Sequence, residues 1–166
     1  VWAKEDPRQA QAYLQNMAQR HLEHPEQHEA PDTMAWNRVI SAYAIRHEQP
    51  AQAAALLEDF WEFANAHSFD HKIYPDLLSY NAVLEGWARV GNAVEANKTW
   101  TRLQMGGGTA QSTSTLPNIM SYTSVIKANG GDLERVDELA QECLQAYQDQ
   151  EQSSSLDQET TSTSPQ

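Results

Sequence analysis

One sequence pattern occurs three times in this chain, and it limits the folds that the chain can adopt. Each copy has a Pro, an Asp or Asn, two mostly apolar residues, a small residue, an aromatic residue, a polar residue and then an apolar pair. The copies begin at Pro31, Pro75 and Pro117, so they follow one another after 44 and 42 residues. Periods of about 20–50 residues are typical of stacked repeats, in which each unit buries its apolar face against its neighbours.

The apolar residues of each copy are spaced as on one face of a helix. They are Trp36, Val39, Ile40 and Tyr43 in the first copy, Tyr80, Val83, Leu84 and Trp87 in the second, and Tyr122, Val125 and Ile126 in the third. We interpret these stripes as helix core. A polar residue directly follows each aromatic, namely Asn37, Asn81 or Thr123. These three residues are expected to project off the packed stripe, and their recurrence indicates a role other than packing.

The same kind of periodicity predicts helices over 6–22, 33–46, 51–67, 77–89, 93–104, 119–128 and 133–148, and nothing resembles a strand. Asp6, Asn92 and Asp132 are expected to cap the helices that follow them, and Gly91 suits a left-handed C-cap. Further apolar stripes are expected to include Tyr13, Val94, Leu144 and Tyr147. We therefore predict an all-α fold in which one helix is followed by three helical hairpins.

Low-complexity segments interrupt and end this pattern. Gly106, Gly107 and Gly108 open a Ser/Thr-rich run. We interpret it as a flexible insertion because a phosphate loop would need a Gly-Lys-Ser/Thr motif and a preceding strand. The polar composition from residue 150 to residue 166 predicts a disordered tail. Because the chain starts inside a helix-forming run without an initiator Met, we expect it to be an excerpt of a longer protein.

The net charge of −12 argues against nucleic acid as a partner, but the charge is unevenly distributed. The three repeated helices have a balance of +3, from Arg38, Arg46, Arg89 and Lys127 against Glu85. The stretch 132–149 has a balance of −5. The acidity lies mostly outside the repeated helices, so the objection to nucleic acid is weakened.

Catalytic and metal chemistry have little support in the sequence. His21, His24 and His28 have a spacing that suggests metal binding, but Pro25 interrupts the helix that would align them. His67 and His71 raise the same question, and a solvated loop is the simpler interpretation for both groups. Cys143 is the only cysteine and is expected to be a small core residue. We expect no metal, no cofactor, no small-molecule substrate, no membrane span and no catalytic site in these residues.

The units resemble pentatricopeptide repeats. The resemblance rests on Pro31-Asp32 before Ala35-Trp36-Asn37, on Pro75-Asp76 before Ser79-Tyr80-Asn81, and on Pro117-Asn118 before Ser121-Tyr122-Thr123, with Gly91 and Glu95-Ala96 in the middle unit. It covers roughly residues 8–148. Tetratricopeptide repeats are a poorer match because their Trp-x-x-Leu-Gly opening is missing. The periods of 44 and 42 exceed the family's unit of about 35 residues, and the excess falls at the junctions between units.

This resemblance implies a right-handed α-solenoid of stacked helix-turn-helix hairpins. The predicted parts are residues 1–30, the second helix of a truncated unit with a linker; 31–76, a unit with an extended second helix or loop; 77–118, a unit with the Gly/Ser/Thr-rich insertion; 119–149, a shortened unit; and the tail 150–166.

The resemblance also implies single-stranded RNA binding, at about one base per unit, read by two or three side chains. Asn37 would read a base together with Asp76, and Asn81 together with Asn118. Thr123 would be the base-reading residue of the third unit, with no identifiable partner, and Asp32 would serve the truncated unit. Met34, Leu78 and Met120 would sandwich the bases. In the family's recognition code, Asn with Asp suggests uracil, and Asn with Asn suggests a pyrimidine, often cytosine.

Other interpretations stay open. Asp32, Asp76 and Asn118 could simply cap helices, and Asn37 and Asn81 could cap or face solvent. The family association suggests RNA processing or stability in a mitochondrion or plastid. The alternative function is a protein–protein interaction scaffold with a basic partner and no RNA contact. A third possibility is a recognition arm for a catalytic domain outside these residues.

Overall fold

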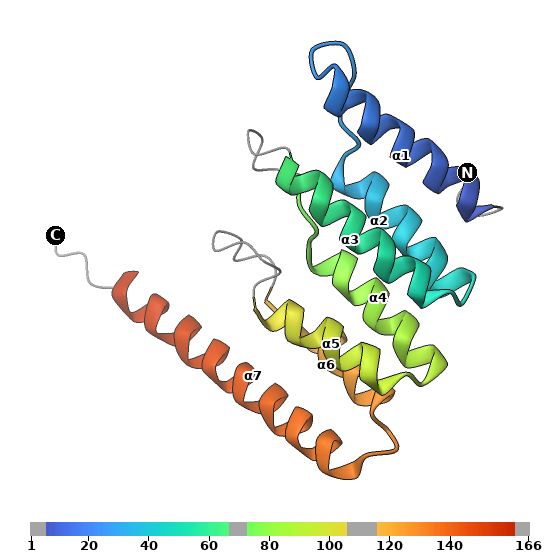
Figure 1. The fold of residues 1–166 in the computed structure, drawn as a ribbon. Coiled ribbons are helices and arrows are strands. Elements are labelled where there is room, and N and C mark those ends of the chain that lie inside the picture. Colours follow the sequence, from blue (N-terminus) through green and yellow to red (C-terminus); the bar gives the residue numbers. More distant parts are fainter. Residues whose placement is uncertain (1–5, 67–72, 106–115, 162–166) are drawn as a thin grey trace, which may run out of the picture.

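The computed structural model describes residues 6–66, 73–105 and 116–161. These residues form seven α-helices and one π-helical turn, with no strand among them. The elements are α1 (Pro7–Glu23), α2 (Thr33–Ser41), η2 (Ala42–Arg46), α3 (Pro50–Ala66), α4 (Leu77–Val90), α5 (Ala93–Gln104), α6 (Ile119–Ala128) and α7 (Leu133–Thr161). Figure 1 shows them arranged in chain order, from α1 at one end of the molecule to α7 at the other. The prediction of an all-α fold is confirmed.

Local capping residues determine where most of these helices begin and end. The Asp6 side chain accepts the N–H of Arg8, and Asn92 accepts the N–H of Glu95. Asp132 accepts the N–H of Arg135 at 3.1 Å. Such side chains satisfy backbone donors that have no partner within a helix. Gly91 ends α4 with φ 66°, so the four predicted capping positions are confirmed.

The predicted helix over 33–46 is α-helical as far as Ser41 and ends in the π-helical turn η2. The turn that follows it contains Glu48 with φ 52°, and the corresponding turn after α4 contains Gly91 with φ 66°. Glu48 lies 11 residues after Asn37, whereas Gly91 lies 10 residues after Asn81. A π-helical turn accommodates one extra residue in a helix. We infer that η2 takes up the extra residue and keeps the following turn in its left-handed conformation.

The three copies of the repeated pattern form α2, α4 and α6, which we call the repeated helices. They lie side by side, with α4 between α2 and α6, and each also packs against the helix that follows it. Gly86 permits one close approach, because a Cβ atom there would lie 3.0 Å from both Ala44 Cβ and Pro50 Cβ. A side chain at this position would force α4 away from η2 and the start of α3.

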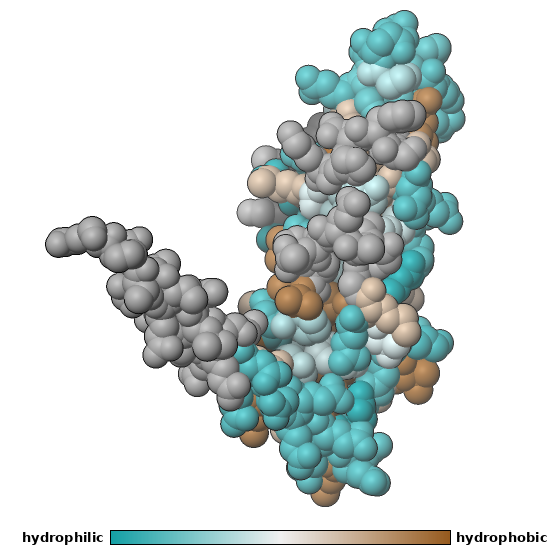
Figure 2. Space-filling view, turned by 90° about the vertical axis from the view of Figure 1, so that its left-hand side faces the viewer, coloured by the Kyte–Doolittle hydropathy of each residue, from teal (hydrophilic) through white to brown (hydrophobic). Residues whose placement is uncertain are grey.

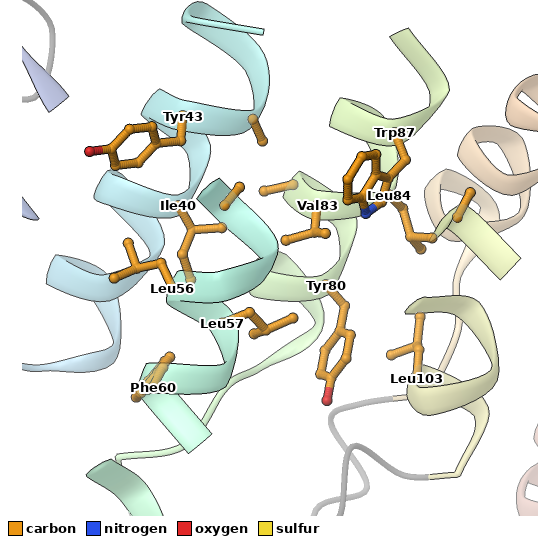
Figure 3. Close-up of a cluster of buried hydrophobic side chains, with 14 of the residues drawn as sticks. Ile40, Tyr43, Leu56, Leu57, Phe60, Tyr80, Val83, Leu84, Trp87 and Leu103 are labelled. Atoms are coloured by element: carbon orange, nitrogen blue, oxygen red, sulfur yellow. The ribbon is translucent and has the colours of Figure 1, made fainter. Parts of the chain in front are cut away.

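Aromatic contacts anchor the repeated helices to the helices between them. Trp36 of α2 stacks on Phe60 of α3, with ring centroids 4.8 Å apart. Tyr122 of α6 makes an edge contact with Trp100 of α5 at 4.7 Å. Figure 3 shows the cluster around α4, in which Ile40, Leu56, Leu57, Phe60, Tyr80, Val83, Leu84, Trp87 and Leu103 come together from four helices. The aromatic residue of each copy is therefore core, as predicted.

Four residues that the sequence assigned to apolar stripes are exposed instead. They are Tyr13, Val94, Leu144 and Tyr147. The last two lie on α7, whose main contact is with α6 on one side, so its other side is not covered by a described helix. Helical periodicity shows which residues share a face, but burial also requires a neighbouring element to cover that face.

The structure also corrects the predicted disordered tail. Helix α7 does not end near residue 149 but continues to Thr161. No Pro or Gly lies between Leu133 and Thr161, so nothing in the sequence breaks the helix, although its last part is too polar to form core. Residues 162–166 lie outside the described residues.

Candidate functional site

Two clusters of polar side chains link neighbouring repeated helices. The first polar cluster consists of Asn37 of α2, Asp76 before α4 and Ser79 of α4. Asn37 Nδ2 donates to Asp76 Oδ1 at 3.0 Å, and the Ser79 hydroxyl donates to Asn37 Oδ1 at 2.5 Å. Asp76 Oδ1 also accepts the backbone N–H of Ser79 at 3.0 Å. The same carboxylate therefore caps α4 and binds the amide from α2.

The second polar cluster repeats this arrangement one step along the chain. It consists of Asn81 of α4, Asn118 before α6 and Ser121 of α6. Asn81 Nδ2 donates to Asn118 Oδ1 at 3.3 Å, and the Ser121 hydroxyl donates to Asn81 Oδ1 at 2.6 Å. Asn118 Oδ1 also caps α6 by accepting the N–H groups of Met120 and Ser121, both at 3.1 Å.

The sequence pattern explains why both clusters form. The cap residue precedes each repeated helix, and the Asn follows the buried aromatic in the helix one unit earlier. Packing of neighbouring repeated helices then brings the cap of one helix to the Asn of the other. The structure thus joins the two pairs that the resemblance implies, Asn37 with Asp76 and Asn81 with Asn118. Asp76 and Asn118 therefore cap their helices and bind the Asn amides at the same time.

The environment of the two Asn residues differs from the sequence prediction. Asn37 and Asn81 do not project freely from the packed stripe, because only 5 % and 9 % of their surfaces are exposed. Each amide lies between two repeated helices and uses its carbonyl to accept from a buried Ser. A buried amide needs such partners, since leaving it without a hydrogen bond is costly.

The predicted residues at the two ends of the array form no such pair. Thr123 is exposed, and its hydroxyl donates to the Ile119 carbonyl at 2.7 Å within α6. Asp32 caps α2 by accepting the N–H of Ala35 at 2.7 Å. Within the described residues, neither of them meets a polar side chain from a neighbouring repeated helix. The sequence had identified no partner for Thr123.

The three apolar residues proposed to flank bases occupy equivalent places. Met34, Leu78 and Met120 are each the second residue of a repeated helix, and they are 59 %, 59 % and 64 % exposed. The Arg38 side chain contacts the sulfur of Met34 at 3.3 Å. Figure 2 shows one face of the molecule, on which hydrophobic residues are scattered among hydrophilic ones. Exposed apolar residues at three equivalent positions are therefore a feature of the repeat.

Glu85 partly neutralises the basic residues of the repeated helices. Its Oε1 accepts from Arg89 Nε at 3.0 Å and from Lys127 Nζ at 3.3 Å, which links α4 to α6. Burial raises the pKa of Glu85, but the hydrogen bonds from Arg89 and Lys127 outweigh it, and the pKa lies below its usual value. Arg38 and Arg46 are exposed on α2 and η2.

Another polar contact was not foreseen from the sequence. Asn97 of α5 and Asn129 after α6 donate to each other, at 2.9 Å and 3.1 Å. Asn129 Nδ2 also donates to the Val125 carbonyl at 2.8 Å. This reciprocal pair fixes the end of α6 against α5, and it involves no residue of the two polar clusters.

A pocket of about 280 Å³ lies between α3, α4 and α5. Its charged lining consists of Glu58, Glu95, Lys98 and Arg102. Lys98 pairs with Glu95, and Arg102 pairs with Glu58. Because these charges compensate one another, the pocket gives no specific indication of an ionic ligand.

The remaining candidate residues have structural surroundings. A nitrogen of the His21 ring lies 2.5 Å from the His28 carbonyl, so these two residues close the loop after α1. Cys143 is half-buried against the core. Among the described residues, no three His, Cys, Asp or Glu residues come together to hold a metal ion. His67, His71 and Gly106, Gly107 and Gly108 lie outside the described residues.

The described part of the chain also contains no helix that is both long enough and apolar enough to cross a membrane.

Ser79 and Ser121 are the residues of the clusters that the sequence analysis did not single out. Both are fully buried, and both are the third residue of a repeated helix. The repeated pattern does mark their position, because each copy has a small residue directly before the aromatic. A small residue alone, however, indicates close packing and not a hydrogen bond. Ala35 occupies this position in α2.

Comparison with known proteins assigns no family to the chain. No protein-family model matches it, and no curated protein sequence is significantly similar to it. Its function therefore has to be argued from the two polar clusters and their surroundings.

Proposed function

We propose that this chain is a single-stranded RNA-binding module, built as a right-handed solenoid of pentatricopeptide-like hairpins and reading about one base per unit. The observation that carries the proposal is the recurrence of an Asn amide joined to the cap residue of the next repeated helix. From the resemblance alone, we also propose a role in RNA processing or stability in a mitochondrion or plastid.

The first polar cluster leaves one donor and one acceptor for a base. Asn37 Nδ2 has two hydrogens and gives one to Asp76. Asp76 Oδ1 accepts the contacts within the cluster, while Oδ2 accepts none from the described residues. An acceptor beside a donor matches uracil, whose N3–H donates and whose carbonyl oxygens accept. Cytosine also offers a donor beside an acceptor, N4–H and N3, so the choice of uracil at this pair follows the recognition code of the resemblance, in which Asn with Asp suggests uracil.

The second polar cluster leaves donors only. Asn81 Nδ2 again has one hydrogen to spare. Asn118 is an exposed residue that uses its oxygen for the cap and for Asn81, so its amino group is the part left for a ligand. Cytosine presents two adjacent acceptors, N3 and O2, and two donors can bind them. This pair therefore favours cytosine, and the two clusters together favour a pyrimidine pair.

The surroundings provide the remaining contacts that a single strand needs. Met34, Leu78 and Met120 are exposed at equivalent positions and supply apolar surface on which bases can pack. Arg38 contacts Met34, so positive charge lies beside one of these surfaces. With a net charge of −12, the chain depends on such local charge to hold phosphates.

Binding of short single-stranded RNAs tests this proposal. Wild-type protein is titrated with oligonucleotides that carry U-C or C-U in an adenine background, and with a pure adenine strand, at low and physiological salt. We expect preference for one of the pyrimidine pairs. The double variant Asn37→Ala/Asn81→Ala should weaken that binding about tenfold or more, because a lost hydrogen bond at each base costs about 1 kcal/mol.

Thr101→Ala is the control. It removes a polar side chain that bonds only within its own helix, α5, and that belongs to neither polar cluster. We expect its RNA affinity to stay close to wild type. If the folded wild-type protein binds none of the RNAs at low salt, the proposal fails and the protein-scaffold function becomes the better one.

A further inference from the structure

The two buried Ser residues occupy the centre of each polar cluster. Ser79 Oγ accepts the backbone N–H of Asp76 at 3.1 Å, and Ser121 Oγ accepts that of Asn118 at 3.1 Å. Each hydroxyl lies within 2.6 Å of the Asn carbonyl oxygen one unit earlier and 3.1 Å from the cap side chain. A hydroxyl has a single hydrogen to donate, and we assign it to the shorter contact, in which the Asn oxygen accepts it.

We infer that Ser79 and Ser121 are positioning residues that set which way the Asn37 and Asn81 amides face, and thereby which group each amide offers to a base. An amide has two ends of nearly the same shape but opposite hydrogen-bonding character. Where the Ser hydroxyl donates to the Asn amide, the carbonyl end of that amide must face the Ser. The amino group must then point to the cap residue, where its second hydrogen remains for the ligand.

The first polar cluster has two constraints on this orientation. Asp76 is a carboxylate and can only accept, so it independently requires the amino end of Asn37. Ser79 requires the carbonyl end on the other side. The two requirements agree, so Asp76 still holds the orientation of the Asn37 amide when the Ser79 hydroxyl is removed.

The second polar cluster depends more on its Ser. Asn118 is itself an amide, and its oxygen is directed by the capping contacts of Met120 and Ser121. The contact between Asn81 and Asn118 is also longer, at 3.3 Å, than the 3.0 Å between Asn37 and Asp76. Without the Ser121 hydroxyl, the Asn81 amide should therefore rotate by about 180° more readily. Removal of the Ser79 hydroxyl should have a smaller effect on the Asn37 amide.

This inference rests on the proposed function, because an amide orientation affects specificity only if the amide reads a base. An Asn that has turned offers an acceptor where it had offered a donor. We expect Ser121→Ala to reduce discrimination about tenfold at the base read by Asn81, while discrimination at the base read by Asn37 stays unchanged. Ser79→Ala should have a smaller effect, confined to the other base.

The experiment measures affinities for RNAs with single-base changes at each of the two positions, using Ser79→Ala, Ser121→Ala and the control Ser41→Ala. Ser41 ends α2 and belongs to neither cluster. All measurements are made below the unfolding transition of each variant, with helix content checked by circular dichroism. Equal loss of affinity for every RNA, or unchanged discrimination in Ser121→Ala, would overturn the inference, because a purely structural role would act on all sequences alike.

A second readout separates this inference from the proposed function. In NMR spectra of the free protein, the side-chain amide hydrogens of Asn81 should be distinct and protected from exchange in wild type and in Ser41→Ala. They should lose protection in Ser121→Ala. If no RNA binds and this loss is seen, the proposed function fails while the positioning role stands. If protection persists in Ser121→Ala, the positioning role is wrong whatever the RNA result.

Discussion

Asp76 and Asn118 each make two kinds of contact, because each caps its own helix and also binds an Asn of the preceding repeated helix. Asp76 caps α4 with the same oxygen that binds the Asn37 amide, and Asn118 does so for α6 and Asn81. A capping residue is placed by its own helix, so its position is well defined before any ligand arrives. The proposed base-reading pairs are thus held by contacts that also stabilise the fold.

Asp76→Asn tests the donor and acceptor assignment at the residue scale. The variant replaces the Asp76 acceptor with an amide, whose oxygen keeps the cap and whose amino group points to the ligand. We expect preference at this position to move from uracil to cytosine, by about tenfold, because a well-placed pair of contacts is worth about 1–3 kcal/mol. Affinities for RNAs that differ only at that base measure the change. A uniform loss of affinity without a changed preference would contradict the assignment.

The two left-handed turn residues allow a paired stability prediction. Gly91 has φ 66° and Glu48 has φ 52°. Residues other than Gly adopt this conformation at a cost of about 1–2 kcal/mol. Gly91→Ala should therefore lower the free energy of unfolding by about 1 kcal/mol. Glu48→Gly should raise the same quantity, by less than about 1 kcal/mol, because Gly is also more flexible in the unfolded chain.

Urea denaturation of the two variants measures these changes. The free energy of unfolding should fall in Gly91→Ala and rise in Glu48→Gly. If both substitutions change it in the same direction, the turn conformation does not determine their effect.

At the scale of the elements, the repeated helices are connected by polar contacts as well as by core packing. Glu85 of α4 binds Arg89 on its own helix and Lys127 on α6. The reciprocal pair of Asn97 and Asn129 connects α5 with the end of α6. Polar contacts of this kind depend on direction, so they determine how neighbouring helices are placed relative to one another.

Glu85 predicts a specific pH dependence of the contact between α4 and α6. Its folded-state pKa is lowered, with burial opposing the larger combined effect of Arg89 and Lys127. A lowered carboxyl pKa contributes stability above the unfolded value of about 4.5, and this contribution is lost as pH falls through the folded pKa. Glu85→Gln should therefore show a shallower fall in the free energy of unfolding between about pH 5 and pH 3 than wild type.

Thermal or urea unfolding at several pH values measures this slope. Glu62→Gln is the matched control, since Glu62 is an exposed carboxylate on α3, and it should keep the wild-type slope. Identical slopes for wild type and Glu85→Gln would refute the assigned role of this ion cluster.

At the scale of the whole molecule, stability is distributed unevenly along the stack. Helix α4 packs against α2, η2, α3, α5 and α6, whereas the main contact of α1 is with α2 and that of α7 is with α6. In a stack of units with contacts only between neighbours, the central elements open least and the ends open most readily. The proposed reading pairs all involve α4 or its direct neighbours.

Hydrogen exchange tests this distribution. Backbone amides of α4 should exchange most slowly, and those of α1 and α7 should exchange faster, because opening an end helix breaks fewer helix–helix contacts than opening α4. Mass spectrometry of peptides from each helix follows the exchange. Equal protection of α1 and α4 would mean that the chain unfolds as one cooperative unit instead.

Local chemistry made much of this structure predictable. Asp6, Asn92 and Asp132 are caps, and Gly91 is a left-handed turn residue, because each acts on backbone groups within a few residues of itself. The repeated pattern predicted the repeated helices and their aromatic core positions. These features depend on short spacings or on the period of the repeat, and both can be read along the chain. The association of Asn37 with Asp76 was expected from the resemblance and not from the residues alone.

Only the tertiary structure decided the burial and orientation of the same residues. It buried Asn37 and Asn81, directed the Ser79 and Ser121 hydroxyls to their carbonyls, and left Leu144 exposed on α7. It also placed the π-helical turn η2 directly before the turn that contains Glu48. Such outcomes depend on which helices pack together and how closely. Contacts between residues about 40 positions apart are determined by that packing rather than by the local sequence.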